Sequence, residues 1–257
     1  GTPDEVFGHM GQVLADGGAW VPGRTIESHA PKPEQIRQPQ DVVLYTRDLS
    51  FGYDFPLGEH IDLEFHSGEV TALTGVGKST LGLTLAGLLK PMAGRVCMAD
   101  DLVPPHRENN VITWKSRDLL GRIGMVFQEP EHQFAASTVR DEVAIGPKSM
   151  GKTDEEAYSI ADRLLERLNL SRFAKANPFT LSGGEKRRLS VASMLAAAPK
   201  VLVMDEPTFG QDFPTWTSMV QLIAGARDQG CAVIMITHDE PLIEALGARR
   251  ILVREGE

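Results

Sequence analysis

The sequence predicts an α/β fold in which a block of helices is inserted into a core built on a parallel sheet. Three short stretches, 70–74, 201–204 and 233–237, are nearly continuous runs of apolar residues. Such runs are typical of central strands that are covered on both faces. Two further stretches, 42–46 and 61–65, alternate apolar and polar residues, as expected of strands with one exposed face.

The helical block lies between the first and second halves of the predicted core. Thr153 precedes three acidic residues, which is the pattern of a helix N-terminus with a capping box. Apolar residues then recur on one helical face, at Ala157, Ile160, Ala161, Leu164, Leu165 and Leu168. We therefore expect a helical subdomain over about residues 129–190.

Composition limits the class of protein. The chain has 257 residues, 42% of them apolar, and a formal net charge of −9. These values suit one large domain with a substantial core. The negative charge argues against a nucleic-acid partner, because phosphate backbones are bound by clustered Lys and Arg. Cys97 and Cys231 lie far apart without metal-binding spacing, so we expect two packing residues in a reducing compartment.

Two features of the sequence bear on membranes and on the start of the compact domain. No apolar run reaches membrane-spanning length and the first residues do not resemble a signal peptide, so membrane association is expected to come through a partner. Residues 2–5 (TPDE) have the pattern of a helix start. A Pro- and Gly-containing stretch at 17–40 reads as a linker, and the compact domain is expected to begin near Asp41.

A candidate phosphate site lies at residues 73–80 (LTGVGKST), where a predicted strand leads into an apolar helix. In a P-loop, backbone amides and the helix N-terminus hold phosphates, a Lys reaches the terminal phosphates and a hydroxyl binds Mg²⁺. Lys78 and Ser79 stand where those roles require. The usual spacing is GxxxxGK[ST], whereas one residue separates Gly75 from Gly77, so the loop is three residues short. Alone, this segment is equally compatible with an ordinary strand, turn and helix.

Two later segments carry further residues for phosphate chemistry. Ser182 in LSGGE is placed as the N-cap of an apolar helix, which either binds a phosphate or is simply capped. The second apolar strand ends at Asp205 and Glu206, at the edge where open α/β sheets bind ligands. Asp205 is suited to the Mg²⁺ shell and Glu206 to orienting or deprotonating a water. A carboxylate pair at a strand end is otherwise an ordinary solvated surface.

The order of these segments resembles the ABC ATPase family. The resemblance is carried by a series of motifs. Tyr53 stands at the position of the adenine-stacking aromatic residue, and it is followed by residues 75–80, Gln128, LSGGE, VLVMDEP, Gln211-Asp212 in TFGQD, and His238. Each motif is weak alone, but the whole series in family order from residue 41 onwards is specific. The resemblance implies a P-loop NTPase core with a mixed sheet, a small antiparallel β subdomain and the inserted helical subdomain, over residues 41–257.

The resemblance also implies ATP and Mg²⁺ as ligands and assigns roles to residues. Glu206, His238 and Gln128 are the expected catalytic residues, and Ser79, Gln128 and Asp205 the expected Mg²⁺ ligands. The expected nucleotide-binding residues are Tyr53, Gly75, Gly77, Lys78, Ser79, Thr80, Ser182, Gly183, Gly184 and Asp212. Since these domains pair head to tail, the LSGGE segment of one copy would face the P-loop of another.

A finer resemblance lies in residues 127–134 (FQEPEHQF) and 141–147 (DEVAIGP). Similar segments occur in ATPases of energy-coupling factor (ECF) and cobalt-type importers, where the first is a helix that contacts a transmembrane coupling protein. The alternative is an ordinary surface of the helical subdomain. The resemblance implies a peripheral protein at the cytoplasmic face of the cell membrane. Its implied partners are a second ABC ATPase domain, the coupling protein and a substrate-binding membrane subunit, and the cargo a vitamin, vitamin precursor or transition-metal ion.

The front of the chain fits the same family. Residues 1–7 (GTPDEVF) resemble the tail with which many importer ATPase domains finish. We therefore expect residues 1–40 to be the tail of a preceding domain plus a linker, and the chain to be the second half of a tandem ATPase. A soluble ABC protein of the DNA-repair or ribosome-associated kind is disfavoured, because the sequence has neither a long coiled coil nor a basic surface.

Two explanations of the short P-loop remain open. In the first explanation, the loop has three further residues that are absent from this sequence. We favour this explanation because every other expected catalytic position is intact. Alternatively the deletion is real, and the chain is a catalytically degenerate structural or regulatory subunit.

Overall fold

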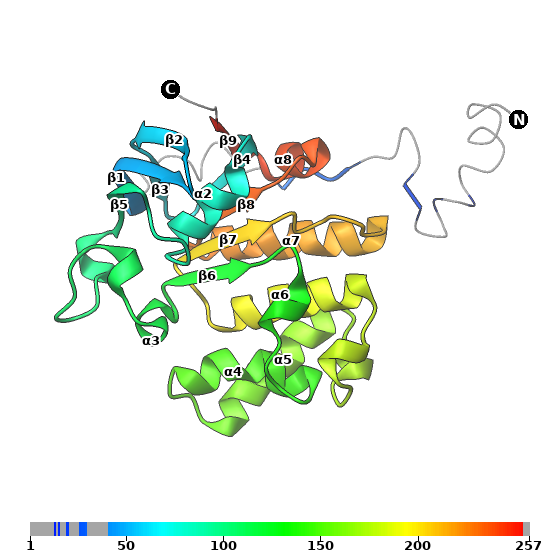
Figure 1. Ribbon diagram of the computed structural model, residues 1–257. Helices are drawn as coiled ribbons and strands as arrows, with labels where there is room; N and C mark the ends of the chain where they lie inside the picture. Colours follow the sequence, from blue (N-terminus) through cyan, green and yellow to red (C-terminus); the bar gives the residue numbers. More distant parts are fainter. Residues whose placement is uncertain (1–12, 14, 16–18, 21–25, 30–40, 254–257) are drawn as a thin grey trace, which may run out of the picture.

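A five-stranded sheet forms the centre of the molecule, and a four-stranded sheet and a group of helices lie on either side of it (Figure 1). The computed structural model describes residues 13, 15, 19–20, 26–29 and 41–253. The helix start expected at residues 2–5 and most of the expected linker lie outside the described residues.

The central sheet has the strand order β6-β7-β8-β4-β9, and each of its described pairings is parallel. The strands are β4 (Val70–Gly75), β6 (Ile123–Val126), β7 (Val201–Asp205), β8 (Ala232–Ile236) and β9 (Arg249–Val253). The three apolar runs in the sequence are β4, β7 and β8, which lie next to one another. All three strands therefore end at the same edge of the sheet.

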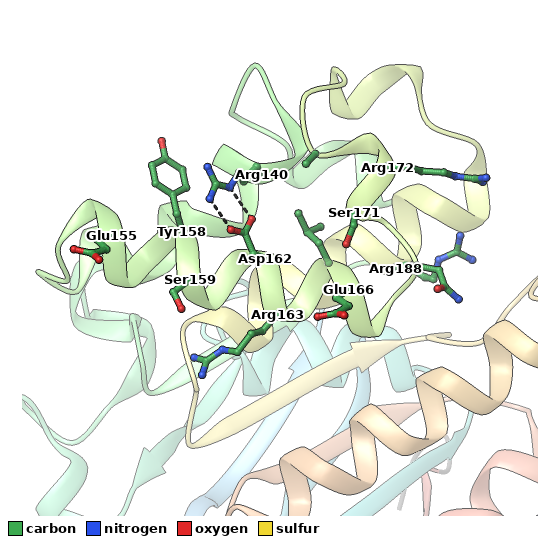
Figure 2. Close-up of a pocket in the computed structure, with 13 residues that line it drawn as sticks. Arg140, Glu155, Tyr158, Ser159, Asp162, Arg163, Glu166, Ser171, Arg172 and Arg188 are labelled. Carbon is green, nitrogen blue, oxygen red and sulfur yellow. Dashed lines mark hydrogen bonds and ion pairs between the residues drawn. The ribbon is translucent and has the colours of Figure 1, made fainter.

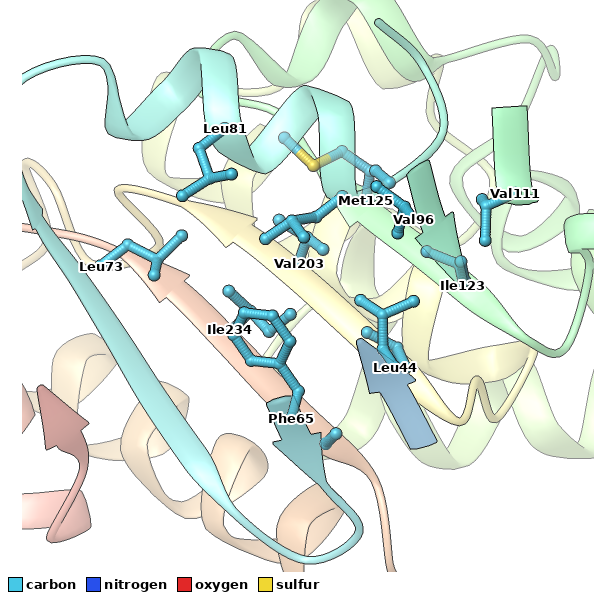
Figure 3. Packing of buried hydrophobic residues seen from close by; sticks show 14 of the residues in the cluster. Leu44, Phe65, Leu73, Leu81, Val96, Val111, Ile123, Met125, Val203 and Ile234 are labelled. Atoms are coloured by element: carbon cyan, nitrogen blue, oxygen red, sulfur yellow. The ribbon is translucent and has the colours of Figure 1, made fainter. Parts of the chain in front are cut away.

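Alternate residues of these strands enter two different buried clusters. Val203 and Ile234 face a cluster that includes Leu44, Phe65 and Leu81 (Figure 3). Their neighbours Leu202 and Val233 face helices on the opposite side of the sheet. Because both faces are buried, the strands need no polar alternation, which explains their continuous apolar sequence.

The second sheet is antiparallel and is built around β1 (Val42–Gly52), which pairs with β2 (Pro56–Ile61), β3 (Glu64–His66) and β5 (Ala93–Met98). The predicted single strand at 61–65 is wrong, since the chain divides there between β2 and β3. The Thr46 hydroxyl donates to the backbone oxygen of Ile61 and accepts from the amide of Leu63, both at 2.8 Å. This sheet is the expected antiparallel β subdomain, whereas the central sheet, expected to be mixed, has only parallel pairings among the described residues.

Helices cover the central sheet on both faces. Helix α2 (Lys78–Leu85) follows β4 and packs against the antiparallel sheet, whereas α7 (Phe213–Asp228) and α8 (Glu240–Leu246) lie on the other face. Short helical turns complete the connections: η1 (Asp100–Leu102), η2 (Val111–Thr113), α3 (Ser116–Leu119), η3 (Pro130–Gln133), η4 (Ser171–Phe173) and η5 (Pro178–Thr180).

The helical subdomain consists of α4 (Val139–Ser149), α5 (Asp154–Arg167) and α6 (Gly183–Ala196), which share a third buried cluster. The predicted start of α5 is confirmed, with Thr153 and Glu156 forming a capping box. The helix expected within residues 127–134 is only the four-residue 3₁₀ turn η3, whose first residue is a proline. Gln133 in this turn donates to the backbone oxygen of Met125 at 2.6 Å, so side-chain bonds hold the segment against β6.

Both cysteines are buried and unpaired, as packing residues would be. Burial raises the pKa of the Cys231 thiol to about 12. Within the described part of the chain, no helix combines the length and the apolar character that crossing a membrane requires.

The buried face of α5 is open to a direct test. Leu165 is 1% exposed, so we expect Leu165→Ala to lower the free energy of unfolding by about 2–4 kcal/mol through lost burial and the cavity left behind. Arg163 on the exposed face is the matched control, and Arg163→Ala should change it by less than about 0.5 kcal/mol. Urea denaturation followed by circular dichroism measures both, and equal effects would contradict the assigned helix face.

Candidate active site

The loop between β4 and α2 consists of Val76 and Gly77 alone. Gly75 and Gly77 both adopt positive φ, at 98° and 75°, and a Cβ at Gly75 would lie 2.1 Å from the backbone oxygen of Val253. Val76 donates its amide to that same oxygen at 3.3 Å. The two-residue connection therefore joins β4 directly to α2, and both explanations of the short loop stay open.

The start of α2 brings two predicted residues, Lys78 and Ser79, to the C-terminal end of β7. The Ser79 hydroxyl hydrogen-bonds to the Asp205 carboxylate. The Lys78 ammonium lies 4.0 Å from the Glu206 carboxylate, and both side chains are mostly buried. Thr80, also predicted to contact nucleotide, is 8% exposed in the first turn of α2. Four of the predicted residues thus form one group of hydroxyl, ammonium and two carboxylates.

Glu206 occupies an unusual backbone conformation. Its φ is +46°, a region that residues other than glycine adopt at a cost. Its amide donates to the oxygen of Ile236 at 2.8 Å, and its carboxylate accepts from the Thr237 hydroxyl at 3.1 Å. The end of β8 therefore holds both the backbone and the side chain of Glu206.

Arg187 is a site residue that the sequence analysis missed. Its guanidinium is 7% exposed and donates to the backbone oxygens of Glu206 and Gln128, both at 2.6 Å. One side chain from α6 thereby fixes the chain after β6 and after β7. The sequence feature that could have revealed Arg187 is a charged residue at a buried position of the helix that begins at LSGGE.

The LSGGE segment forms the N-terminus of α6 as predicted. Ser182 caps the helix, and its amide and hydroxyl donate to the Glu185 carboxylate at 2.9 and 2.8 Å. Ser182 and Gly183 are exposed, and a Cβ on Gly183 would meet no atom within 4 Å. This end of α6 therefore presents an open surface rather than a contact with the P-loop of the same chain.

The remaining predicted residues lie at loop ends. Asp212 caps α7 by accepting from the Thr215 amide at 2.9 Å. The Thr215 hydroxyl, with a smaller effect from this amide, lowers the pKa of the Asp212 carboxyl. Tyr53 is 62% exposed between β1 and β2. His238 is exposed after β8, and in the described residues no hydrogen bond joins its side chain or that of Gln128 to another group. The structure therefore brings the start of α2 to the two carboxylates, whereas the side chains of Asp212, Tyr53, His238 and Gln128 make no hydrogen bond or ion pair with that group in the described residues.

Two of the hollows in the described part of the molecule are lined by residues outside the group of hydroxyl, ammonium and two carboxylates. One of about 1180 Å³ lies on the helical subdomain and is lined by charged side chains, among them the Arg140–Asp162 ion pair (Figure 2). Another of about 490 Å³ is lined by Gln128, the glycines of LSGGE and residues 209–211. Only the second includes predicted site residues.

Asp205 and Ser79 fit a magnesium site that shares its ligands with a nucleotide. Mg²⁺ is usually held by one or two carboxylates together with phosphate oxygens and water. Burial raises the pKa of the Asp205 carboxyl, the Glu206 charge adds to this effect, and the Ser79 hydroxyl and Lys78 offset part of it. A cation beside Asp205 would stabilise the ionised form. In the described residues, no cluster of three or more His, Cys, Asp or Glu could hold a metal ion.

Comparison with known proteins decides the family. Residues 59–209 match the family described as ABC transporter. The chain belongs to this family. It is 34% identical over 216 residues to the energy-coupling factor transporter ATP-binding protein EcfA of Methanothermobacter thermautotrophicus, covering 82% of this chain and 68% of that protein. This ABC ATPase domain thus has the fold and family predicted from sequence, both of which support ATP hydrolysis.

Two other relatives extend the comparison. YkoD of Bacillus subtilis, named for HMP/thiamine import, is 42% identical over 209 residues, which are 80% of this chain and 36% of that protein. The structure of cbiO1 from Clostridium perfringens, described as part of the ABC transporter complex cbiONQ, matches with a TM-score of 0.67 at 29% identity, covering 84% of this chain and 86% of that one. The chain spans little more than a third of the first two curated relatives, at 36% and 38% of their lengths.

The raised pKa of Asp205 gives a stability prediction. Because its folded-state pKa lies above the unfolded value, ionisation opposes folding, and stability of the nucleotide-free protein falls as pH rises through the folded pKa. We expect Asp205→Asn to raise Tm at pH 7 by a few degrees and to abolish any further rise caused by Mg²⁺ and ATP.

Asp141 is a control of opposite sign. Hydrogen bonds from Thr138 and Tyr158 lower the pKa of its carboxyl, so its ionised form stabilises the fold above the unfolded pKa. Asp141→Asn should therefore lower Tm at pH 7. Differential scanning calorimetry measures both variants, and a fall in Tm for Asp205→Asn would contradict the assigned environment.

Proposed function

We propose that this chain hydrolyses ATP as one nucleotide-binding domain of a head-to-tail pair and thereby powers an importer of the ECF or cobalt type. The cargo class we propose is a vitamin, a vitamin precursor or a transition-metal ion. The observation that carries the proposal is the group formed by Lys78, Ser79, Asp205 and Glu206 where β4, β7 and α2 meet.

Each member of the group has a chemical role in this proposal. Lys78 binds the terminal phosphates, and Ser79 and Asp205 hold Mg²⁺. Bound Mg²⁺ would neutralise developing charge on the phosphate oxygens. Glu206 orients the attacking water and accepts its proton, and its fixed backbone and bond to Thr237 limit the positions its carboxylate can take. Gln128 and His238 complete the site from the adjacent strand ends.

The proposed pairing follows from the open N-terminus of α6. Gly183 and Gly184 begin α6, whose first amides have no partner within the helix, and the exposed Gly183 carries no side chain that would block a ligand. We propose that these amides face the phosphates of a nucleotide held by another copy. Asp212 and Tyr53 would contact nucleotide or partner at the same interface. Either an identical chain or the other half of a tandem protein, whose tail and linker would be residues 1–40, can supply the second copy.

The transport role rests on resemblance and on relatives. The FQEPEHQF and DEVAIGP segments and the names of EcfA, YkoD and cbiO1 support an importer with a transmembrane coupling protein and a substrate-binding membrane subunit. In this arrangement the chain lies peripherally at the cytoplasmic face of the membrane.

The short P-loop favours a second candidate, a degenerate regulatory subunit. Val76 uses its amide on Val253, so the loop offers phosphates only the amides at the start of α2. A P-loop of the usual length adds amides that surround the phosphates from the opposite side. Weak nucleotide binding by this half would leave catalysis to the other half of the pair.

ATP turnover distinguishes an active from a degenerate site. We expect Glu206→Gln to lower kcat by at least about 100-fold, because it removes the group that accepts the proton of the attacking water. Glu166→Gln makes the same charge change on the exposed face of α5 and should leave kcat unchanged. Phosphate release by the intact protein measures both. Turnover that survives Glu206→Gln, or none in the unmodified protein, contradicts the catalytic assignment.

Loop length has its own test. Insertion of Pro-Asn-Gly between Gly75 and Val76 restores the GxxxxGKS spacing. If the short loop limits binding, the insertion should lower the Kd for Mg-ATP by at least about tenfold, since each added amide contributes a charge-assisted bond to phosphate. The same insertion after Gly151, in the exposed turn between α4 and α5, is the control. Calorimetric titration measures the Kd for Mg-ATP. An unchanged Kd would show that the length of the loop does not limit the binding of Mg-ATP.

A further inference from the structure

Trp20, which lies before the ABC domain in sequence, packs onto the start of α7. Its ring meets those of Phe213 and Trp216 edge to face, with centroid distances of 5.1 and 5.2 Å. Phe213 and Trp216 are themselves stacked at 6.0 Å. The Trp20 indole also donates to the backbone oxygen of Gln211 at 3.3 Å. This contact joins the N-terminal segment to the loop that follows the catalytic carboxylates.

Residues 26–29 attach at the other end of α7. The His29 amide donates to the oxygen of Ala245 at 2.6 Å, and the guanidinium of Arg227 donates to the His29 oxygen at 2.7 Å. Arg227 is 4% exposed and also donates to Leu246 at the end of α8, so it is part of the core. Ile26 packs against the buried cluster beneath these helices. We call Trp20 and residues 26–29 the N-terminal anchor.

A hydrogen-bond chain leads to Glu206 from Trp216, whose ring contacts Trp20 of the anchor. The Trp216 indole and the Thr208 hydroxyl both donate to one oxygen of Asp239, at 2.8 and 2.7 Å. The Asp239 amide donates to the Thr237 hydroxyl at 3.0 Å, and that hydroxyl donates to the Glu206 carboxylate at 3.1 Å.

The chain is placed to respond to small displacements. Trp216, Thr208 and Thr237 are at most 5% exposed, so water cannot readily replace a lost bond. Asp239 joins the loop after β7 to the turn that carries His238. A shift of Trp216 therefore moves the surroundings of Glu206 and His238 together, whereas the phosphate-binding group at α2 has no contact with the anchor in the described residues.

Trp20 is not needed to complete the core. Its side chain is 42% exposed, whereas Trp216 beneath it is 2% exposed. Its indole nitrogen bonds to the backbone of the loop 208–212 rather than to a helix or strand. A residue that only filled the core would be buried and would not reach this loop.

We propose that Trp20 and Trp216 are positioning residues, through which docking of the N-terminal anchor sets the rate of the hydrolytic step. This proposal rests on the proposed ATPase function. Trp20 holds the backbone of the loop 208–212, and Trp216 transmits its position through Asp239 to Thr237 and Glu206. The segment that precedes the domain thereby becomes a control element for the site, acting on kcat rather than on nucleotide binding.

The test compares single variants in the full chain. Trp20→Phe keeps the ring contacts and removes the bond to Gln211, and Trp216→Phe removes the bond to Asp239. We expect each to lower kcat for ATP about tenfold while KM stays within about twofold, as for a misplaced catalytic group. Trp114→Phe loses an equivalent indole bond, to the Glu108 oxygen at 2.8 Å, in a different cluster and should leave kcat unchanged.

A second measurement does not require turnover. Hydrogen exchange of the amides at 208–212 and 238–239 should be at least about tenfold faster in Trp20→Ala than in the unmodified protein, with exchange in β4 and β8 unchanged. Val13→Ala, at a 64% exposed position of the N-terminal segment, is the control.

These measurements separate the two proposals. Faster local exchange supports the anchor even if the unmodified protein proves inactive, in which case only the ATPase function fails. Unchanged exchange overturns the anchor whatever the turnover. In an active protein, faster exchange with unchanged kcat, or a change confined to KM, overturns the positioning role.

Discussion

The buried guanidinium of Arg187 donates to the backbone oxygens of Gln128 and Glu206 and so connects three parts of the molecule. It extends from the helix that begins at LSGGE, reaches the end of β6, and reaches the end of β7. Burial lowers the pKa of this guanidinium, and the charges of Asp205 and Glu206 offset that effect. An arginine remains charged at neutral pH, so its desolvation is tolerated because carbonyls and carboxylates surround it. Movement of α6 must therefore move Gln128 and Glu206 with it.

The same arrangement explains how Glu206 keeps a strained backbone. A positive φ at a residue with a Cβ persists only where its surroundings fix it. Here the amide is held by Ile236, the oxygen by Arg187 and the carboxylate by Thr237. Three neighbouring segments thus share the cost of one conformation. The result is a carboxylate whose position depends on β8 and α6 rather than on its own loop, which suits the role that we propose for Glu206 in orienting a water.

Local patterns in the sequence were sufficient for much of this structure. The apolar runs of β4, β7 and β8, the capping box at Thr153 and the N-cap at Ser182 depend on neighbouring residues, and each was predicted correctly. The break at Asp62 and Leu63 was not, because it depends on a hydroxyl from Thr46 in another strand.

The site shows the same division. Lys78, Ser79, Asp205 and Glu206 were recognised by motif, and the parallel strand order brings them together. Arg187 was missed because its partners lie 59 and 19 residues away in the chain, and Trp216 because its bond to Asp239 crosses from α7 to α8. No periodicity within either helix distinguishes such a side chain from an ordinary core residue.

The short loop before α2 affects only one part of the proposed phosphate site. The first N–H groups of any helix lack partners within the helix, so the start of α2 retains its amides and its favourable dipole whatever the loop length. Lys78 and Ser79 lie within that first turn and keep their direction toward β7. The loop before them loses its reach, because Gly75 and Val76 are held against Val253 on the edge strand β9. Shortening therefore removes the part of the cradle that lies outside the helix and preserves the part that meets Asp205 and Glu206. The Asp205–Glu206 pair and the loop before α2 are thus held by different contacts, so the position of the pair does not depend on the length of that loop.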